Sequence, residues 1–411
     1  MSMNGHNGKP SGVGPLSHIK VLDLCHARAG PTCVRVLADF GAEVIQVVRP
    51  AEAGSMDGSF PNFDRENLHR NKRSIAIDLQ TDAGRQVFYR LVKEADVVVE
   101  NFRADVKYRL RVDYETLRQI NPRIVMGSIS GFGQDGPYGK RPGVDQIAQG
   151  MGGLMSITGP PGSGPWRVGI PIDDLCAGMF LSQGIMAALL ERERSGQGQW
   201  VHTSLLEAQI AMLDFQATRW LIAGEVPGQA GNDHPTGFPT GVFPAKDGVV
   251  NIGSSGDRMF RDFLRVIGAE ELAEDPRFAT SAARAKTENR TALREAVDAK
   301  MRQMTVNELI EKLNDVGVPA GPIYTIDQTF ADPQVQHLQM AQTVVSPVYG
   351  PLAIVRSPVR LSRTSTSLRS AAPVPGGDTE QVLVELGLSA DEIAELEQSG
   401  AIGMKKPAVA G

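Results

Sequence analysis

The 411-residue sequence predicts an α/β fold, with a doubly wound, mostly parallel sheet in a large domain and a smaller α/β domain beside it. Two observations support this prediction. Short apolar runs alternate with helical segments through the first 130 residues. Most of these runs are apolar at successive positions, as expected of strands that are buried on both faces. In such folds, ligands bind beyond the carboxyl ends of the strands.

The elements of the large domain follow in order along the chain. Strands are predicted at residues 19–24, 43–48, 95–100 and 124–129, and helices at 31–40, 82–94 and 114–120. Gly41 marks the end of the first helix. A Gly/Pro-rich region at 127–164 is predicted to be a long loop, and a helix at 175–194, a strand at 199–203 and a helix at 205–222 come after it. This alternation is Rossmann-like.

Shifts in composition predict the domain boundaries. Residues 1–16 are rich in Gly, Ser, Asn and Pro and are expected to form a disordered lead-in. Residues 17–223 form the N-terminal part of the large domain, and 224–247 a crossing linker. Residues 248–319 form the small domain, with a strand at 249–252 and helices near 258–267 and 287–301. Residues 320–411 combine a return linker with the C-terminal part of the large domain, which ends in short helices at 378–386 and 389–397.

The composition argues against several classes of function. The net charge is −5 and the basic residues are scattered, so we expect no nucleic-acid partner. The three cysteines lack metal-ligand spacing and no H-x-x-H pattern occurs, so we expect no metal site. The sequence shows no secretory signal and no apolar run that would span a bilayer. We therefore expect a cytoplasmic protein without a membrane partner.

Two adjacent aspartates, Asp173 and Asp174, lie between a short apolar run that is predicted to be a strand and the long apolar helix at 175–194. A carboxylate in this position either caps the helix or acts as a catalytic group such as a nucleophile. As a cap it accepts hydrogen bonds from free backbone N–H groups, and the positive end of the helix dipole favours its ionised form. Position alone favours the cap, because caps are far commoner than nucleophiles, but both interpretations remain open.

Several cations follow predicted strands and would share one edge of the sheet. Arg28 lies in the loop at 25–30, Arg49 follows the second strand, and Arg103 and Arg109 follow a later one. The segment 71–74 adds two more cations before a short strand. Each cation alone is an ordinary surface charge, but together they could bind a ligand with several phosphates. The chain has no G-x-G-x-x-G or Walker-type loop and no G-x-S-x-G elbow, which disfavours dinucleotide binding and serine hydrolysis.

Several segments then converge on one family. The sequence resembles the family III CoA-transferases, the group that includes formyl-CoA transferase and carnitine CoA-transferase. The resemblance covers nearly the whole chain. Its principal segments are 21–24 with 29–31, 37–45, 71–74, 96–103, 131–133, 174 with 178–179, and 196–199.

The resemblance implies a reaction and its residues. The family's single nucleophilic aspartate falls on Asp174 and not on Asp173. It implies that CoA moves from an acyl-CoA thioester to a small carboxylic acid, through an aspartyl mixed anhydride and an aspartyl-CoA thioester. CoA is then a substrate, and no cofactor is bound permanently. The CoA-binding positions that carry over to the large domain are Arg28, Ala29, Arg49, Ile77, Asn101, Phe102, Arg103 and Arg109.

The resemblance also implies an intertwined homodimer, and two alternative functions remain. An α-methylacyl-CoA racemase on the same fold would need a histidine where this chain has Val144, in the sequence Gly143-Val144-Asp145. Valine cannot carry a proton, which weakens this alternative, although His26 or another group could serve. A non-catalytic CoA-binding protein would have no need of the carboxylate of Asp174.

Overall fold

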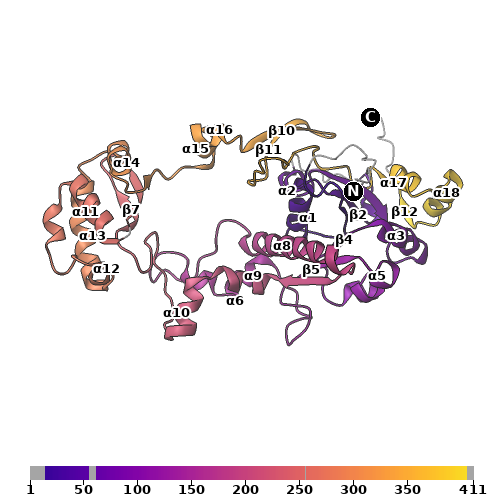
Figure 1. Cartoon of the computed structure of the whole chain (residues 1–411), viewed down its shortest axis with the longest axis horizontal. Helices are drawn as coiled ribbons and strands as arrows, with labels where there is room; N and C mark the ends of the chain where they lie inside the picture. Colours follow the sequence, from indigo (N-terminus) through magenta and orange to yellow (C-terminus); the bar gives the residue numbers. More distant parts are fainter. Residues whose placement is uncertain (1–13, 55–61, 255, 405–411) are drawn as a thin grey trace, which may run out of the picture. The chain divides into compact units, whose positions relative to one another are not determined.

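The structure is a computed structural model that describes residues 14–54, 62–254 and 256–404. The chain divides into two compact units. Unit 1 comprises the residues up to 153, 169–217 and those from 336 onward, and unit 2 comprises 154–168 and 218–335. Unit 2 therefore begins and ends outside the span 248–319 that the sequence predicts for the small domain, and it also includes a piece of the Gly/Pro-rich region. Figure 1 shows the elements of each unit.

Unit 1 is built on a seven-stranded sheet in the order β12-β3-β2-β1-β4-β5-β6. All neighbouring strands are parallel except β12, which pairs antiparallel with β3. The prediction of an α/β fold with a mostly parallel sheet is confirmed. The strands are β1 (Lys20–Asp23), β2 (Glu43–Val48), β3 (Lys72–Ile77), β4 (Val97–Glu100), β5 (Val125–Ser130), β6 (Trp200–Ser204) and β12 (Ile402–Gly403).

Helices cover both faces of this sheet, which explains why its strands are apolar at consecutive positions. Val21 belongs to the core on one face and Leu22 to the core on the other, because successive strand side chains point in opposite directions. One core contains α1 (Ala29–Asp39) and α8 (Ile172–Ser195); the other contains α3 (Asp82–Glu94), α5 (Tyr114–Ile120), α17 (Thr379–Glu385) and α18 (Ala390–Gln398) (Figure 1).

The long helix α8 begins earlier than the sequence predicts. It starts at Ile172, so both aspartates lie inside its first turn, and no strand precedes it: residues 165–170 are irregular. Within the described residues, α8 is the one helix that is long and apolar enough to cross a membrane, contrary to the sequence prediction. A core helix meets the same criterion, and α8 packs against α1, β5 and β6.

The segments outside the sheet and its covering helices include one predicted helix that the structure divides in two. The helix predicted at 205–222 is interrupted at Asp214, whose φ of 49° is left-handed, and so forms α9 (Leu205–Met212) and α10 (Phe215–Ala223). The last residues of α10 belong to unit 2. The other elements are α2 (Phe63–Leu68), α4 (Val106–Leu110), α6 (Asp145–Met151), β10 (Ala341–Ser346) and β11 (Gly350–Val355).

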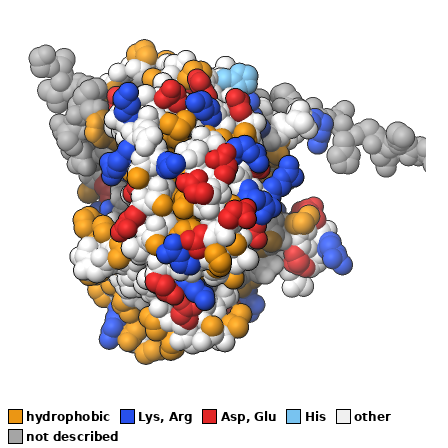
Figure 2. Space-filling model, turned by 90° about the vertical axis from the view of Figure 1, so that its left-hand side faces the viewer, with side chains coloured by type: hydrophobic (Ala, Val, Ile, Leu, Met, Phe, Trp, Pro, Cys, Tyr) orange, Lys and Arg blue, Asp and Glu red, His pale blue; other side chains and the backbone are white. Residues whose placement is uncertain are grey.

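Unit 2 has its own apolar core around a three-stranded antiparallel sheet in the order β7-β8-β9. Figure 2 shows basic and acidic side chains interspersed over the face that it presents. The elements of this unit are β7 (Thr240–Pro244), β8 (Val249–Gly253), β9 (Ala320–Gly321), α7 (Leu154–Ile157), α11 (Gly256–Ile267), α12 (Ser281–Arg284), α13 (Thr287–Met301), α14 (Val306–Asp315), α15 (Ile326–Ala331) and α16 (Pro333–His337).

Candidate active site

Two adjoining cavities lie along the carboxyl edge of the unit 1 sheet. The larger, of about 530 Å³, is lined by the segments that follow β1, β4, β5 and β6. The smaller, of about 80 Å³, is lined by residues at the ends of β1, β2 and β3. Both cavities share His26 and Phe102. This is the edge where an open α/β sheet binds its ligands.

The structure brings most of the predicted site residues to these cavities. The larger cavity is lined by Arg28, Ala29, Asn101, Phe102, Arg103 and Asp174. The smaller one is lined by Arg49, Ile77 and Phe102. Arg109 lines neither cavity and is exposed on α4. Arg141 also lines the larger cavity, and its guanidinium lies 3.8 Å from the centre of the Tyr138 ring.

The side chain of Asn101 fastens the loop after β1 to the loop after β4. Its Oδ1 accepts the backbone N–H of His26 at 2.8 Å, and its Nδ2 donates to the carbonyl of His26 at 2.7 Å. The next residue, Ala27, has a φ of 56°, which is unusual for a residue with a side chain. Asn101 thus holds the backbone that leads into α1 in this conformation. Its amide group is already engaged, so its contribution to the site is to shape the loop.

A buried ion pair between Lys72 and Asp23 stabilises the start of the loop after β1. Lys72 Nζ lies 2.8 Å from Asp23 Oδ2, with both side chains fully buried, and Asp23 Oδ1 accepts the N–H of Cys25 at 3.0 Å. Burial raises the pKa of Asp23, but the ammonium of Lys72 and the neighbouring His69 oppose it, and the net pKa is lowered. Lys72 is therefore a structural cation. The suggestion that the cations of segment 71–74 join a phosphate site on the carboxyl edge is wrong.

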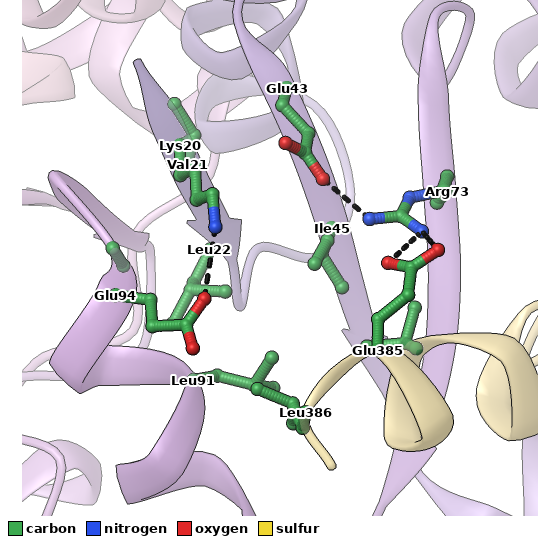
Figure 3. Close-up of a pocket in the computed structure, with 12 residues that line it drawn as sticks. Lys20, Val21, Leu22, Glu43, Ile45, Arg73, Leu91, Glu94, Glu385 and Leu386 are labelled. Carbon is green, nitrogen blue, oxygen red and sulfur yellow. Dashed lines mark hydrogen bonds and ion pairs between the residues drawn. The ribbon is translucent and has the colours of Figure 1, made fainter. Parts of the chain in front are cut away.

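Arg73, the second cation of that segment, lies at the opposite, amino edge of the sheet. There it lines another cavity, of about 100 Å³, and bonds to Glu43 and Glu385 (Figure 3). Lys20 and Glu94 also line this cavity and form an ion pair at 2.9 Å (Figure 3). The charges around this cavity are paired within the chain, and other residues that line it, such as Leu22 and Leu91, are apolar. It offers no arrangement for catalysis.

The start of α8 shows that neither Asp173 nor Asp174 caps the helix. Neither aspartate is the cap residue, since the N-cap position is Pro171. The capping oxygen comes from Asp145 at the start of α6, whose Oδ1 accepts the N–H of Asp173 at 2.9 Å. The side chains of Asp173 and Asp174 therefore do not cap α8. Sequence reasoning missed this role of Asp145, because its partner is 28 residues away along the chain.

Asp174 lines the larger cavity and is half-buried. Burial, with the nearby charge of Asp145, raises the pKa of its carboxyl group to about 6, and Arg28 acts in the opposite direction. The carboxylate is therefore ionised above about pH 6, as a nucleophile must be. The guanidinium of Arg28 also bonds to Asp64 at 2.5 Å.

Close packing of α8 against α1 brings Asp174 beside Arg28. Gly178 lies one helical turn after Asp174, on the same face of α8. A Cβ atom at Gly178 would lie only 2.6 Å from the carbonyl oxygen of Ala29, the first residue of α1. No side chain caps the start of α1, so its first N–H groups are available to an anion near the cavity. The close approach of the two helices therefore requires a glycine at position 178, because any side chain there would collide with the backbone of α1.

A racemase would need proton-transferring side chains in this cavity, and its described lining offers few of them. Val144 lines it and is largely exposed, while His26 is the one histidine among its described lining residues. Asp145, the neighbour of Val144, is buried and engaged in hydrogen bonds. Within the described residues, no group of three or more His, Cys, Asp or Glu side chains could hold a metal ion.

Comparisons with known proteins agree on one family. The sequence profile of CoA-transferase family III matches residues 16–379. The chain is 37% identical to the succinate–glutarate CoA-transferase of Agrobacterium fabrum, over 92% of this chain and 96% of that one. It is 36% identical to the succinyl-CoA–D-citramalate CoA-transferase of Chloroflexus aurantiacus, over 93% and 97%. A CAIB/BAIF family protein of Brucella suis has a similar structure, with a TM-score of 0.78, 35% identity and coverage of 91% and 100%.

Proposed function

Because the chain belongs to CoA-transferase family III and is an enzyme that acts on acyl-CoA and carboxylates, we propose that it transfers CoA from an acyl-CoA thioester to a free carboxylic acid, with Asp174 as the nucleophile. The observation that supports this proposal best is the position of Asp174. Its carboxylate lines the cavity at the carboxyl edge of the sheet, is released from helix capping, and lies near the uncapped start of α1.

The proposed reaction has two halves. A carboxylate oxygen of Asp174 attacks the thioester carbonyl carbon, and the C–S bond breaks to give an aspartyl mixed anhydride and CoA thiolate. The thiolate attacks the aspartyl carbonyl, which releases the first acid as a carboxylate and leaves an aspartyl-CoA thioester. The second acid repeats these steps in reverse and leaves as the new acyl-CoA. Each addition places negative charge on a carbonyl oxygen, which backbone N–H groups would stabilise.

CoA is the substrate that the two adjoining cavities would hold. Arg28 and Arg103 in the larger cavity and Arg49 in the smaller one supply positive charge, and Ile77 and Phe102 supply apolar surface for the adenine. Arg49 would exchange its present partner, Glu52, for a phosphate. Exposed Arg109, the remaining binding position that the resemblance implies, would contact a phosphate outside the cavities.

A small dicarboxylic acid is the proposed acceptor. The relatives are named for succinate, glutarate and D-citramalate, all small dicarboxylates. A second carboxylate needs a cation in the cavity that holds the nucleophile, and Arg141 lines that cavity in addition to Arg28 and Arg103. We propose that the active form is an intertwined homodimer in the cytoplasm. The run of large exposed apolar side chains that includes Trp220, Leu221 and Ile222 supports association with a second copy.

An exchange screen tests this function. The protein is incubated with succinyl-CoA and a panel of free acids, and new CoA thioesters are measured by mass spectrometry. We expect a new thioester with at least one small dicarboxylate and none with Asp174→Ala. In heavy water, a 2-methylacyl-CoA should gain no α-deuterium. Rapid deuterium uptake without any acid acceptor would instead establish racemase chemistry.

A further inference from the structure

The carboxyl group of Asp173 is buried without a hydrogen-bond partner. Asp173 is the second residue of α8, and its exposed fraction is 0%. Within the part of the chain that the structure describes, neither of its carboxylate oxygens accepts a hydrogen bond. An ionised carboxylate in such a place loses its hydration and accepts no hydrogen bond, and the helix dipole offsets only part of that cost.

The neighbouring carboxyl group of Asp145 is also buried, but both of its oxygens accept hydrogen bonds. Its Oδ2 accepts a hydrogen bond from Gln149 Nε2 at 2.7 Å, and its Oδ1 accepts the backbone N–H of Asp173 at 2.9 Å. These donors stabilise the anionic form of Asp145. The two buried carboxyl groups are thus unequal: Asp145 has the environment of an anion, and Asp173 that of a neutral acid.

The other groups that act on Asp173 are mostly acidic as well. Asp174 belongs to its own helix, and Asp145 to α6. The cation Arg28, at the start of α1, acts on Asp174. Burial, followed by the charges of Asp145 and Asp174, raises the pKa of Asp173 to about 7. At Asp174 the charge of Arg28 opposes these effects, and the pKa is raised to about 6.

We infer that Asp173 is held as a neutral carboxylic acid and acts as a positioning residue for the nucleophile, by leaving Asp174 as the only anionic carboxylate on the first turn of α8. This inference rests on the proposed role of Asp174. When Asp173 loses its proton, a second negative charge adjoins Asp174. The site must admit an anionic acid and stabilise a departing thiolate, and added negative charge opposes both steps. Ionisation of Asp173 therefore switches transfer off.

The pH profile of kcat/KM tests this inference with an isosteric variant. For the wild type we expect a rise through about pH 6 as Asp174 ionises, and a fall above about pH 7 as Asp173 ionises, approaching tenfold per pH unit. Asp173→Asn cannot lose a proton, so its profile should keep the rise and stay level to pH 9. Asp173→Ala, which is also neutral, should lose the alkaline fall too, and it covers the case in which the asparagine variant does not fold.

A matched control identifies the titrating group. His26 is the one histidine among the described residues that line the same cavity, and His26→Gln should keep the alkaline fall at its wild-type position. An alkaline fall that persists in Asp173→Asn, or that disappears in His26→Gln, would overturn the inference. A folded Asp173→Asn that binds CoA but has no activity at pH 6.5 would overturn it as well, because a neutral isostere should be sufficient there.

A readout without substrate separates this inference from the proposed function. Infrared difference spectra of the free enzyme between pH 6 and pH 8 should show loss of protonated carboxyl absorption from both aspartates, and the larger band, which is due to Asp173, should be absent in Asp173→Asn. If the band is found but no acid accepts CoA, the proposed function fails while the neutral state of Asp173 stands. If transfer occurs and the band is missing, the inference fails alone.

Discussion

At the residue scale, Asp173 and Asp174 are adjacent in sequence but meet opposite environments. Asp174 faces the cavity and has a cation nearby, whereas Asp173 faces the interior with no partner. The difference follows from helix geometry, because consecutive residues point about 100° apart around the axis. A stability measurement can detect the buried acid whether or not the enzyme turns over.

Asp173→Asn should make stability less dependent on pH. The pKa of Asp173 is about 7 in the folded protein and about 3.9 in an unfolded chain. Between these values the native state holds a proton that the unfolded state has released, so raising the pH lowers the free energy of unfolding. The wild type should therefore lose up to about 4 kcal/mol relative to the variant from pH 4 to pH 7. Thermal unfolding at several pH values measures this, and parallel curves would contradict it.

At the element scale, the approach of α8 to α1 determines where the nucleophile lies. Gly178→Ala should push the helices apart, because the added Cβ meets the backbone carbonyl of Ala29, which cannot move aside. We expect a loss of about 1–3 kcal/mol of stability and a larger relative loss of kcat. Gly184→Ala on the same helix is the control, since its Cβ meets only a side-chain carbon of Val201. An equal effect of both substitutions on kcat would show that this contact does not position Asp174.

The elements themselves could largely be predicted from sequence. Apolar periodicity located β1, β2, β4 and α3 well, because strands buried on both faces and amphipathic helices leave strong local patterns. The start of α8 was misplaced, since its cap comes from Asp145 in another element. The Lys72–Asp23 pair was missed for a similar reason: the two residues are 49 apart in sequence, and no local pattern shows that they meet.

At the scale of the whole molecule, the feature that points to self-association is a cluster of large apolar side chains exposed to solvent. Trp220, Leu221, Ile222 and Val226 are between 55% and 84% exposed within a short stretch. Such a patch is typical of an interface. In the proposed homodimer it is covered by the second copy.

Leu221→Glu should weaken the dimer, because a buried, unpaired carboxylate would be costly at the interface. Light scattering at micromolar concentration should show a dimer for the wild type and a shift toward the monomer for the variant. Leu190→Glu replaces a comparably exposed leucine, 74% against 77%, in unit 1, and it should leave the dimer intact. A wild-type protein that is a stable monomer at this concentration would contradict the assembly.

The central claim is that Asp174 carries the covalent intermediate, and chemical trapping tests it most directly. The enzyme is incubated with acyl-CoA and then treated with hydroxylamine, which converts an activated aspartyl ester to a hydroxamate, or with borohydride, which reduces an aspartyl thioester to an alcohol. Peptide mass spectrometry should find either product on Asp174, in wild type and in Asp173→Asn, and none in Asp174→Asn. A mark on Asp173 or Asp145, or full transfer activity in Asp174→Ala, would contradict the assignment.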